Sequence, residues 1–216
     1  RMPDHLRERI DIEIARHLAG CESLVVRSSS NAEDLAGFSA AGIYDSVNQV
    51  SDAENVIKSI KKVWSSLISP RSIRLRDEVG ISLDDVYMGV IIQEEVKSEY
   101  GGVMVTDNPL ARTNDLHNVY INVGSDSNSV VDNNALPRQY LYNTLEGQGK
   151  TLSLGDYREE LSTNNLMHLE ELSMAGRFLQ SHFSPDYTFK CPLDIEWAIS
   201  DDKLYLLQIR PYGEEQ

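Results

Sequence analysis

Apolar residues recur at helical spacing in the first part of the chain. This period predicts helices over about 4–18 and 52–68, and a third helix that Pro70 opens and Gly80 ends. Asp4 is expected to cap the first of these helices, because a carboxylate at the N-cap can accept a hydrogen bond from a backbone N–H group.

Further along, the period changes to the alternation that is typical of half-buried strands. Helices and strands mix without a steady βαβ order, and no long linker divides the chain. We therefore expect one domain over residues 1–216 with an α+β fold, in which helices flank a mixed, largely antiparallel sheet. The expected elements are strands at 22–27, 86–96, 101–107 (a short turn joining the last two), 118–124, about 138–143 and 150–154, a helix at about 163–183 and a closing hairpin at 192–211.

The closing hairpin carries the most informative pattern. Residues 201–203 are expected to form a three-residue loop. In that register Glu196 lies opposite Gln208, and Asp194 lies opposite Arg210. Because side chains alternate along a strand, these four polar side chains would share one face. The core face would be formed by Ile195, Trp197, Ile199, Tyr205, Leu207 and Ile209.

Two interpretations of this polar face are open. In the first, it is a solvated sheet face with cross-strand ion pairs. In the second, the two carboxylates and the amide oxygen hold Mg²⁺, which prefers a few protein oxygens and completes its shell with substrate phosphates. The arginine beside them then suits a phosphoryl oxygen.

Composition narrows the class of partner and the compartment. The formal net charge is −14, so the summed field repels polyanions and argues against a nucleic-acid partner. Cys21 and Cys191 are the only cysteines among 216 residues, which excludes a disulfide scaffold and fits a reducing, cytoplasmic compartment. No apolar run approaches the roughly 18 residues of a membrane span, so we expect no membrane association.

Four segments resemble one family of phosphotransferases. "DIEWAISDDKLYLLQIRP" resembles the closing hairpin of the ATP-binding domain of phosphoenolpyruvate synthase and pyruvate phosphate dikinase, where D-x-E precedes L-x-x-L-Q-x-R-P. "VVRSSSNAEDLAGFSAAGIYDSV" is similar to the family's R-S-S-x-x-x-E-D-L segment, "VWSSLISPRSIRLRDEVGI" to its helix pair, and "IIQEEVKSEYGGVMVTDNP" to its S-G-V-x-F-T stretch. The segments follow in the family's order from about residue 22 to 211.

The resemblance implies an ATP-grasp-like nucleotide site with Mg²⁺ and ATP as cofactors. It places Asp194, Glu196 and Gln208 on Mg²⁺ and the polyphosphate. It gives catalytic roles to Arg210, on the transferring phosphoryl group, and to Arg27, on phosphate.

The resemblance also implies nucleotide contacts elsewhere in the chain. Arg71 would be a second phosphate-side arginine, and Thr106 would lie near the phosphates. The backbone of Glu94, Glu95 and Val96 would face adenine. The small residues after the first strand would form a loop whose N–H groups approach an anion.

Structural alternatives stand beside several of these assignments. Arg27 could pair with Glu33 or Asp34 and brace the fold. Arg71 could belong to a solvated helix face, and Thr106 could be an ordinary strand threonine.

Two departures from the family pattern bear on function. The family's N-terminal segment with its G-G-K-G lysine does not occur in the chain, and neither does its phosphohistidine domain. We therefore expect a fragment whose partners are a nucleotide and these missing parts. Asn128 stands where the family has a glutamate, and Asn133 where it has a glycine.

The expected function is the ATP- and Mg²⁺-binding part of a dikinase-type phosphotransferase. Such an enzyme passes phosphate from ATP to a histidine of another domain and on to pyruvate or another acceptor, so we expect the isolated chain to be inactive. The alternatives are a degenerate nucleotide-binding or interaction module without catalysis, or the ATP domain of a rifampicin phosphotransferase or a glucan, water dikinase.

Overall fold

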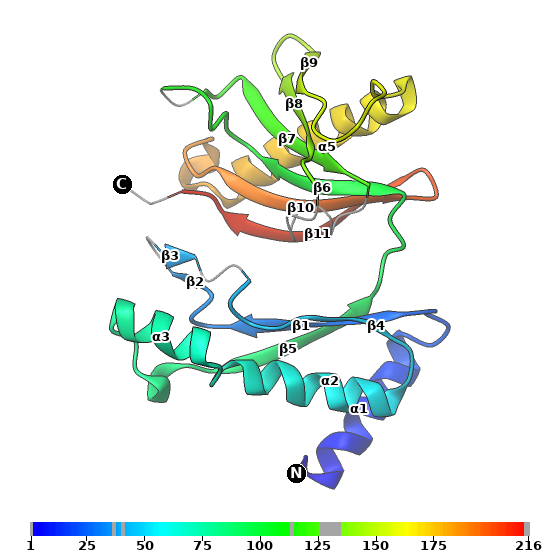
Figure 1. Cartoon of the computed structure of the whole chain (residues 1–216), viewed down its shortest axis with the longest axis vertical. Coiled ribbons are helices and arrows are strands. Elements are labelled where there is room, and N and C mark those ends of the chain that lie inside the picture. The colour runs from blue at the N-terminus through cyan, green and yellow to red at the C-terminus, as the bar shows by residue number, and fades with distance from the viewer. Residues whose placement is uncertain (1, 36–37, 40–41, 113–114, 126–134, 214–216) are drawn as a thin grey trace. The chain divides into compact units, whose positions relative to one another are not determined.

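Helices and antiparallel strands make up the chain, so the expected α+β fold class is confirmed (Figure 1). Every strand pairing among the described residues is antiparallel. The chain forms two compact units, Arg1–Glu95 and Val96–Gln216. The computed structural model describes residues 2–35, 38–39, 42–112, 115–125 and 135–213.

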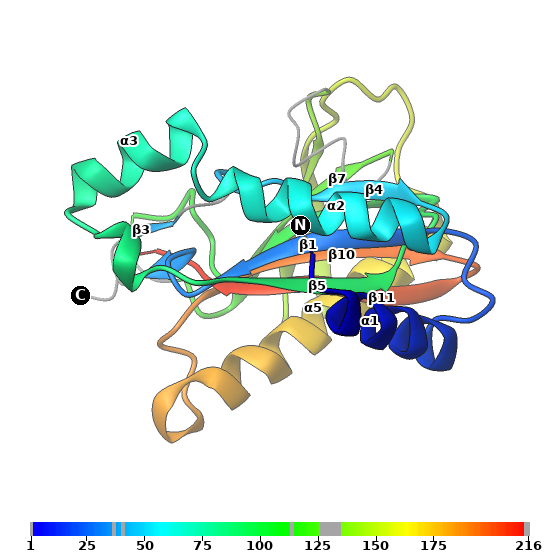
Figure 2. The ribbon, with the colours of Figure 1, turned by 90° about the horizontal axis from the view of Figure 1, so that it is seen from below.

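A three-stranded sheet forms the centre of the first unit. Its strand order is β4 (Val47–Val50), β1 (Leu24–Ser30) and β5 (Met88–Glu94). Helix α2 (Ala53–Ser66) lies along this sheet (Figure 2), and α1 (Asp4–His17) adds partly buried apolar residues to the same core. The buried core residues of the unit are Met2, Leu24, Val26, Val50, Val56, Ile57, Ile60 and Val63.

Helix ends in this unit agree with the predicted helices to within two residues, apart from the first cap. Pro3, not Asp4, occupies the N-cap of α1, and Asp4 begins the helix. Asp52 caps α2 by accepting a hydrogen bond from the Asn55 N–H at 2.8 Å. Gly80 ends the third helix in the left-handed conformation, at φ 70°. The remaining elements are α3 (Pro70–Val79), the 3₁₀-helix η1 (Leu83–Asp85), and the short strands β2 (Asp34–Leu35) and β3 (Phe38–Ser39).

The triple serine belongs to a strand, so the loop expected at this point is wrong. β1 continues because residues 28–30 pair with residues 88–90 of β5. A ladder satisfies backbone groups whatever the side chain, so small polar residues need not end a strand. Ser28 Oγ and Ser30 N donate to the Glu33 carboxylate at 3.3 and 3.2 Å. The Ser30 N–H is therefore already hydrogen-bonded to a carboxylate and is not available to a bound anion.

A six-stranded sheet forms the centre of the second unit, in the order β11-β10-β6-β7-β8-β9. Helix α5 packs against one face of this sheet (Figure 1). The elements are β6 (Tyr100–Val105), β7 (Asn118–Gly124), β8 (Arg138–Asn143), β9 (Gln148–Ser153), α5 (Thr163–Phe183), the 3₁₀-helix η2 (Pro185–Tyr187), β10 (Leu193–Ser200) and β11 (Lys203–Pro211).

Helix α5 holds the sheet through a close contact and a buried arginine. A Cβ at Gly176 would lie 2.2 Å from Met104 Cε, so a larger residue here would have to displace the end of the Met104 side chain from the core. The buried Arg177 guanidinium donates to the backbone oxygens of Thr106 at 2.6 Å and Asn118 at 2.9 Å. Burial lowers the pKa of Arg177. The helix thereby fixes the end of β6 and the start of β7.

The predicted short turn between the strands at 86–96 and 101–107 is wrong. β5 pairs with β1 in the first unit, whereas β6 pairs with β10 and β7 in the second. Sequence proximity favoured a hairpin, but the partners of both strands come from distant parts of the chain.

The closing hairpin has the predicted pairing near Glu196, but its turn is not the predicted three-residue loop. Its turn has two residues, Asp201 and Asp202, with φ 49° and 59°, as a type I′ turn requires. A bulge follows where the register shifts between Glu196 and Trp197, and it leaves Leu207 as the extra residue. The shorter turn and the bulge offset each other, so pairing beyond the bulge matches the three-residue prediction.

The bulge also changes which residues of β11 face the core. Tyr205 lies opposite Ala198, not on the core face where it was expected, and Leu207 is the bulge residue. Leu204 takes the core position instead, opposite Ile199, and packs against the buried cluster of the unit. An alternation argument cannot find this change, because one extra residue inverts the faces beyond it.

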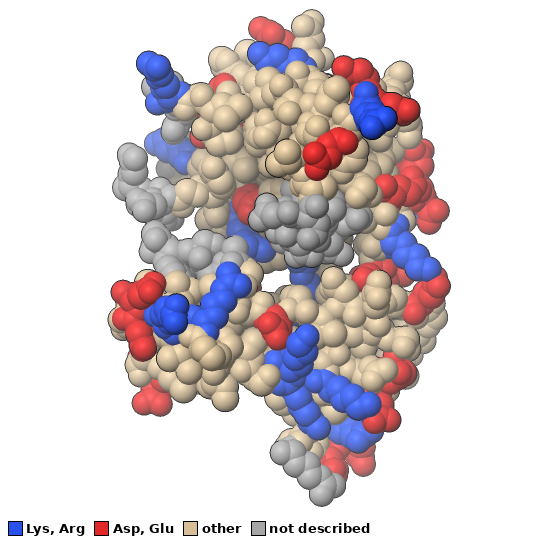
Figure 3. All heavy atoms as spheres, in the orientation of Figure 1, with Lys and Arg blue, Asp and Glu red and all other residues tan. Residues whose placement is uncertain are grey.

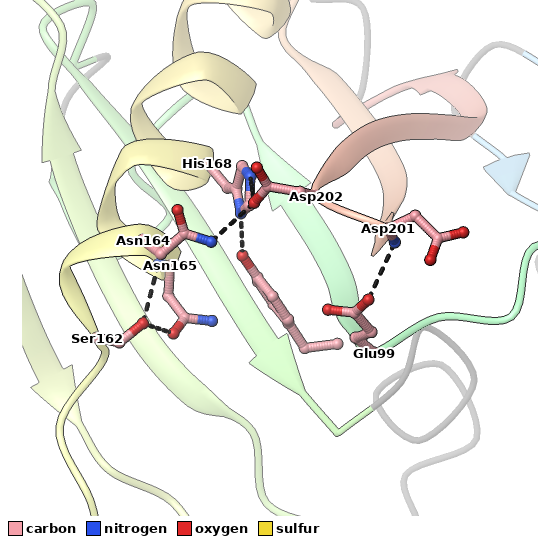
Figure 4. A network of polar contacts seen from close by, with 8 residues as sticks. Glu99, Ser162, Asn164, Asn165, His168, Asp201 and Asp202 are labelled. Carbon is pink, nitrogen blue, oxygen red and sulfur yellow. Dashed lines mark hydrogen bonds and ion pairs between the residues drawn. The ribbon is translucent and has the colours of Figure 1, made fainter.

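A polar network ties α5 to the hairpin turn (Figure 4). His168, on α5, is buried, and its Nε2 lies 3.2 Å from the Asp202 Oδ1. Asn164 Nδ2 donates to the same Asp202 oxygen at 2.9 Å. The backbone N–H of Asp201 donates to the Glu99 carboxylate at 3.0 Å, just before β6. Both turn residues are therefore anchored to neighbouring elements of the unit.

Tyr100 completes this network from the first position of β6. Its hydroxyl is hydrogen-bonded to His168 Nδ1. Burial, together with the nearby Glu99 and Asp202 carboxylates, raises the pKa of Tyr100 to about 12. The phenol therefore keeps its proton and is available as a donor to Nδ1, while Nε2 faces the Asp202 carboxylate.

Surface charge is mixed on both units. In the view of Figure 3, Lys and Arg side chains lie beside Asp and Glu side chains on each unit. In the part of the chain that the structure describes, no helix has the length and apolar character that crossing a membrane requires.

Tyr100 gives a testable prediction about alkaline stability. Its pKa is about 12 in the folded state and 10.0 as a model value, so its contribution to stability is complete below pH 10 and is lost between pH 10 and 12. Tyr100→Phe should lower the free energy of unfolding at pH 7 by about 1 kcal/mol, the typical value of one hydrogen bond. From pH 10 to 12, the variant should lose less stability than the wild type. Urea unfolding at several pH values measures both effects.

The matched control is Tyr187→Phe, which removes a tyrosine that is 76% exposed. This control should follow the wild-type pH dependence. Equal slopes for Tyr100→Phe and the wild type between pH 10 and 12 would contradict the assignment.

Candidate functional site

The four polar residues of the closing hairpin share one face. Asp194 pairs with Arg210, and Glu196 pairs with Gln208, as the sequence predicted. Ile195, between the two carboxylates, is completely buried in the core on the α5 side. Because side chains alternate, the polar row lies on the sheet face opposite α5.

An ion pair crosses this row diagonally. Arg210 Nη2 lies 2.8 Å from Glu196 Oε1, and the two side chains are only 13% and 12% exposed. A charge at this depth is costly unless it is paired, so each partner stabilises the other here. The remaining Nε–H of Arg210 is buried and has no hydrogen-bond partner among the described residues. The guanidinium thus has capacity for a further acceptor, such as a phosphate oxygen.

The oxygen donors of this face fit a magnesium ion that a substrate helps to hold. Asp194 and Glu196 offer hard carboxylate oxygens, and Gln208 offers an amide oxygen. Among the described residues, no group of three or more His, Cys, Asp and Glu could hold a metal by itself. Two carboxylates and an amide suit Mg²⁺ because this ion binds few protein oxygens and takes the rest from water and phosphate.

Two of the three arginines predicted to contact phosphate lie in the first unit. Arg27 is half-buried on β1 opposite Ile91, and it alternates with Val26, which points into the helix-covered core. Arg71 is exposed at the second position of α3, after the N-cap Ser69. By contrast, the buried Arg76 donates to the Leu67 carbonyl at 2.6 Å and braces the helix pair.

The predicted adenine-facing segment lies where β5 ends. Glu94 is exposed and pairs with Leu24 of β1. The Glu95 carboxylate accepts hydrogen bonds from the Ser23 hydroxyl and, at 2.9 Å, from the Gln49 N–H. The Glu95 side chain therefore has a structural task in the first unit, and only the backbone of Glu94 to Val96 remains a candidate for the base.

Thr106 lies on the other side of the sheet from the carboxylates. The residue is completely buried, and its methyl group lies near Gly176 of α5. Its hydroxyl accepts the Leu193 N–H at 2.8 Å, which joins the end of β6 to the start of β10. These contacts agree with the alternative that Thr106 is an ordinary structural threonine. We therefore propose no phosphate contact for its side chain.

One residue of the polar face was missed by sequence reasoning. Asn122 of β7 pairs with Val103 of β6, which pairs in turn with Glu196. The only available signal was its position between the apolar Ile121 and Val123. Asn128 and Asn133, the two departures from the family pattern, lie outside the described residues.

Comparison with known proteins identifies relatives along the whole chain. The model of the pyruvate phosphate dikinase AMP/ATP-binding domain matches residues 1–216. A probable phosphoenolpyruvate synthase of Methanocaldococcus jannaschii is 32% identical over 97% of this chain. A phosphoenolpyruvate synthase of Pyrococcus furiosus is 29% identical over 97% of it, and a rifampicin phosphotransferase of Bacillus cereus is 27% identical over 90%.

The chain is much shorter than these relatives. It spans 19% of the M. jannaschii protein, 29% of the P. furiosus protein and 24% of the B. cereus protein. The α+β architecture and the polar hairpin face are consistent with the matched model. The chain belongs to the pyruvate phosphate dikinase AMP/ATP-binding domain family.

Proposed function

We propose that this chain is the MgATP-binding part of a dikinase-type phosphotransferase and that residues 1–216 form its nucleotide-binding domain. The observation that carries the proposal is the row of Asp194, Glu196, Gln208 and Arg210 on one core-backed strand pair. Family membership supports ATP as the ligand. Transfer of phosphate to a histidine of another domain, and then to pyruvate or another acceptor, belongs to the same proposal.

The proposed chemistry depends on an exchange of partners at the ion pair between Arg210 and Glu196. Without ligand, Arg210 neutralises the half-buried Glu196. Glu196 can bind a cation only if Arg210 turns away, and Arg210 then becomes available to a phosphoryl oxygen. A bound Mg²⁺ would supply positive charge against the polyphosphate. Arg210 is thus proposed to stabilise the charge that develops on the transferring group.

Arginines of the first unit have a supporting part in the proposal. Arg27 and Arg71 are proposed to contact phosphate, because a guanidinium offers two parallel donors that match two phosphate oxygens. The main chain of Glu94 to Val96 is proposed to contact the base. These assignments stand on the family motifs and on the positions of the residues in their own unit.

Other parts of the enzyme and its location also belong to the proposal. The chain spans only 19% and 29% of two of its relatives, so a phosphohistidine domain and a segment with the lysine are proposed as partners. Phosphoenolpyruvate synthases and rifampicin phosphotransferases both occur among the relatives, so pyruvate is one candidate acceptor among several. Cys21 and Cys191 are free thiols, which supports a cytoplasmic location.

Glu196→Gln tests the cation site. The variant keeps the shape of the side chain but loses the charge that a cation needs, so MgATP should bind at least about tenfold more weakly, or about 1.4 kcal/mol. Isothermal titration of the full chain with MgATP measures the change. Glu171→Gln makes the same charge change on an exposed position of α5 and should bind as the wild type does. Equal affinities for Glu196→Gln and the wild type would show that the site lies elsewhere.

Arg27→Lys separates phosphate contact from structural bracing. Lysine keeps the charge but loses the planar fork, so the affinity for MgATP should fall several-fold while the melting temperature changes by no more than about 2 °C. Arg16→Lys, on the exposed last turn of α1, is the matched control. A large fall in melting temperature with unchanged affinity would favour the bracing role instead.

A further inference from the structure

Asn122 is a buried acceptor on the same sheet face as the hairpin carboxylates. It lies between Ile121 and Val123 on β7, and both of these belong to the core on the α5 side. The Asn122 side chain therefore points to the opposite face. Its Oδ1 is buried, and it has no hydrogen-bond partner among the described residues.

The strand register aligns Asn122 with the proposed cation ligands. Gln208 pairs with Glu196, Glu196 with Val103, and Val103 with Asn122, so these residues form one row across four strands. Neighbouring strands lie about 4.8 Å apart, which separates the backbones of Glu196 and Asn122 by about 10 Å. Two side chains and two metal–oxygen bonds of about 2 Å each can span that distance.

The backbone at Asn122 is held closely by the neighbouring strand. A Cβ at Gly102 would lie 2.0 Å from the Asn122 carbonyl oxygen, so glycine at this position lets β6 approach β7 here. Asn122 is therefore carried by a tightly packed strand rather than by a loop. Such a position can present a ligand with little loss of conformational freedom.

A buried amide oxygen without a donor is unfavourable in a sheet, where valine or isoleucine would fit better. An oxygen of this kind needs either a hydrogen-bond donor or a cation. The nearest polar group of its row is the Gln139 amide, directly opposite on β8, yet it donates no hydrogen bond to the Asn122 Oδ1. On the other side, two strands away, lies the Glu196 carboxylate, which is not a donor when ionised. The row therefore favours a cation as the partner.

We propose that the Asn122 side-chain oxygen is a further contact for the cation of the bound metal–nucleotide, opposite Glu196 across Val103. This inference rests on the proposed function and adds one ligand-contacting residue to it. The site would then draw oxygens from β10, β11 and β7, so the cation would be held over the middle of the sheet rather than at its edge.

The test compares two variants of Asn122 in the full chain, titrated with MgATP and with ATP in excess EDTA. Asn122→Val removes the oxygen and should raise the melting temperature by a few degrees, since an unsatisfied buried group is lost. It should weaken MgATP binding at least tenfold and change the affinity for metal-free ATP by less than twofold. Asn122→Asp restores an oxygen with a charge, so it should keep MgATP binding but weaken the binding of metal-free ATP.

The control is Gln139→Val, one strand further along the same row, which should bind both ligands as the wild type does. Wild-type affinity of Asn122→Val for MgATP would overturn the inference and leave the proposed function intact. An equal loss for MgATP and metal-free ATP would also overturn it, because the contact would not be with the cation. If the wild type itself binds MgATP no better than metal-free ATP, the proposed function fails and the inference fails with it.

Discussion

The register of the closing hairpin is the constraint on which the candidate site depends. Two aspartates with positive φ make a tight turn, and a bulge at Leu207 then shifts the pairing by one residue. Without that shift, Arg210 and Gln208 would move by one position relative to Glu196, and alternation would send them to the other face. The network of Tyr100, His168 and Asp202 holds this turn against α5. Packing on the α5 face of the sheet thus helps to set the positions of the polar residues on the opposite face.

Buried charge on the polar face is balanced in a way that suits ligand exchange. Arg210 pairs with Glu196 at low exposure, while one N–H of its guanidinium lacks a partner among the described residues. A pair of this kind adds little to stability but prevents the cost of an isolated charge. A metal–nucleotide could compensate both groups at once, because the cation suits Glu196 and the phosphate suits Arg210. The arrangement therefore favours binding the two together over binding either alone.

The sequence predicted those features that depend only on residues close to one another along the chain. Helical spacing and end signals such as Asp52 and Gly80 located the helices, and alternation identified the two faces of the hairpin near Glu196. What failed depends on partners distant in sequence. The triple serine continues a strand because β5 pairs with it, and the strand at 101–107 leaves its sequence neighbour for β10. Asn122 enters the polar row only through three successive pairings, which no single segment reveals.

The central claim is that the metal–nucleotide binds on the sheet face formed by β10 and β11. Paramagnetic broadening of backbone amide signals by MnATP tests it directly, because the effect falls steeply with distance from the ion. The account predicts that signals of Asp194, Glu196 and Gln208 lose intensity first. Signals of β9, about 19 Å from β10 across four strand spacings, should broaden much later. Broadening of β9 before the hairpin, or none at the hairpin, would contradict the account.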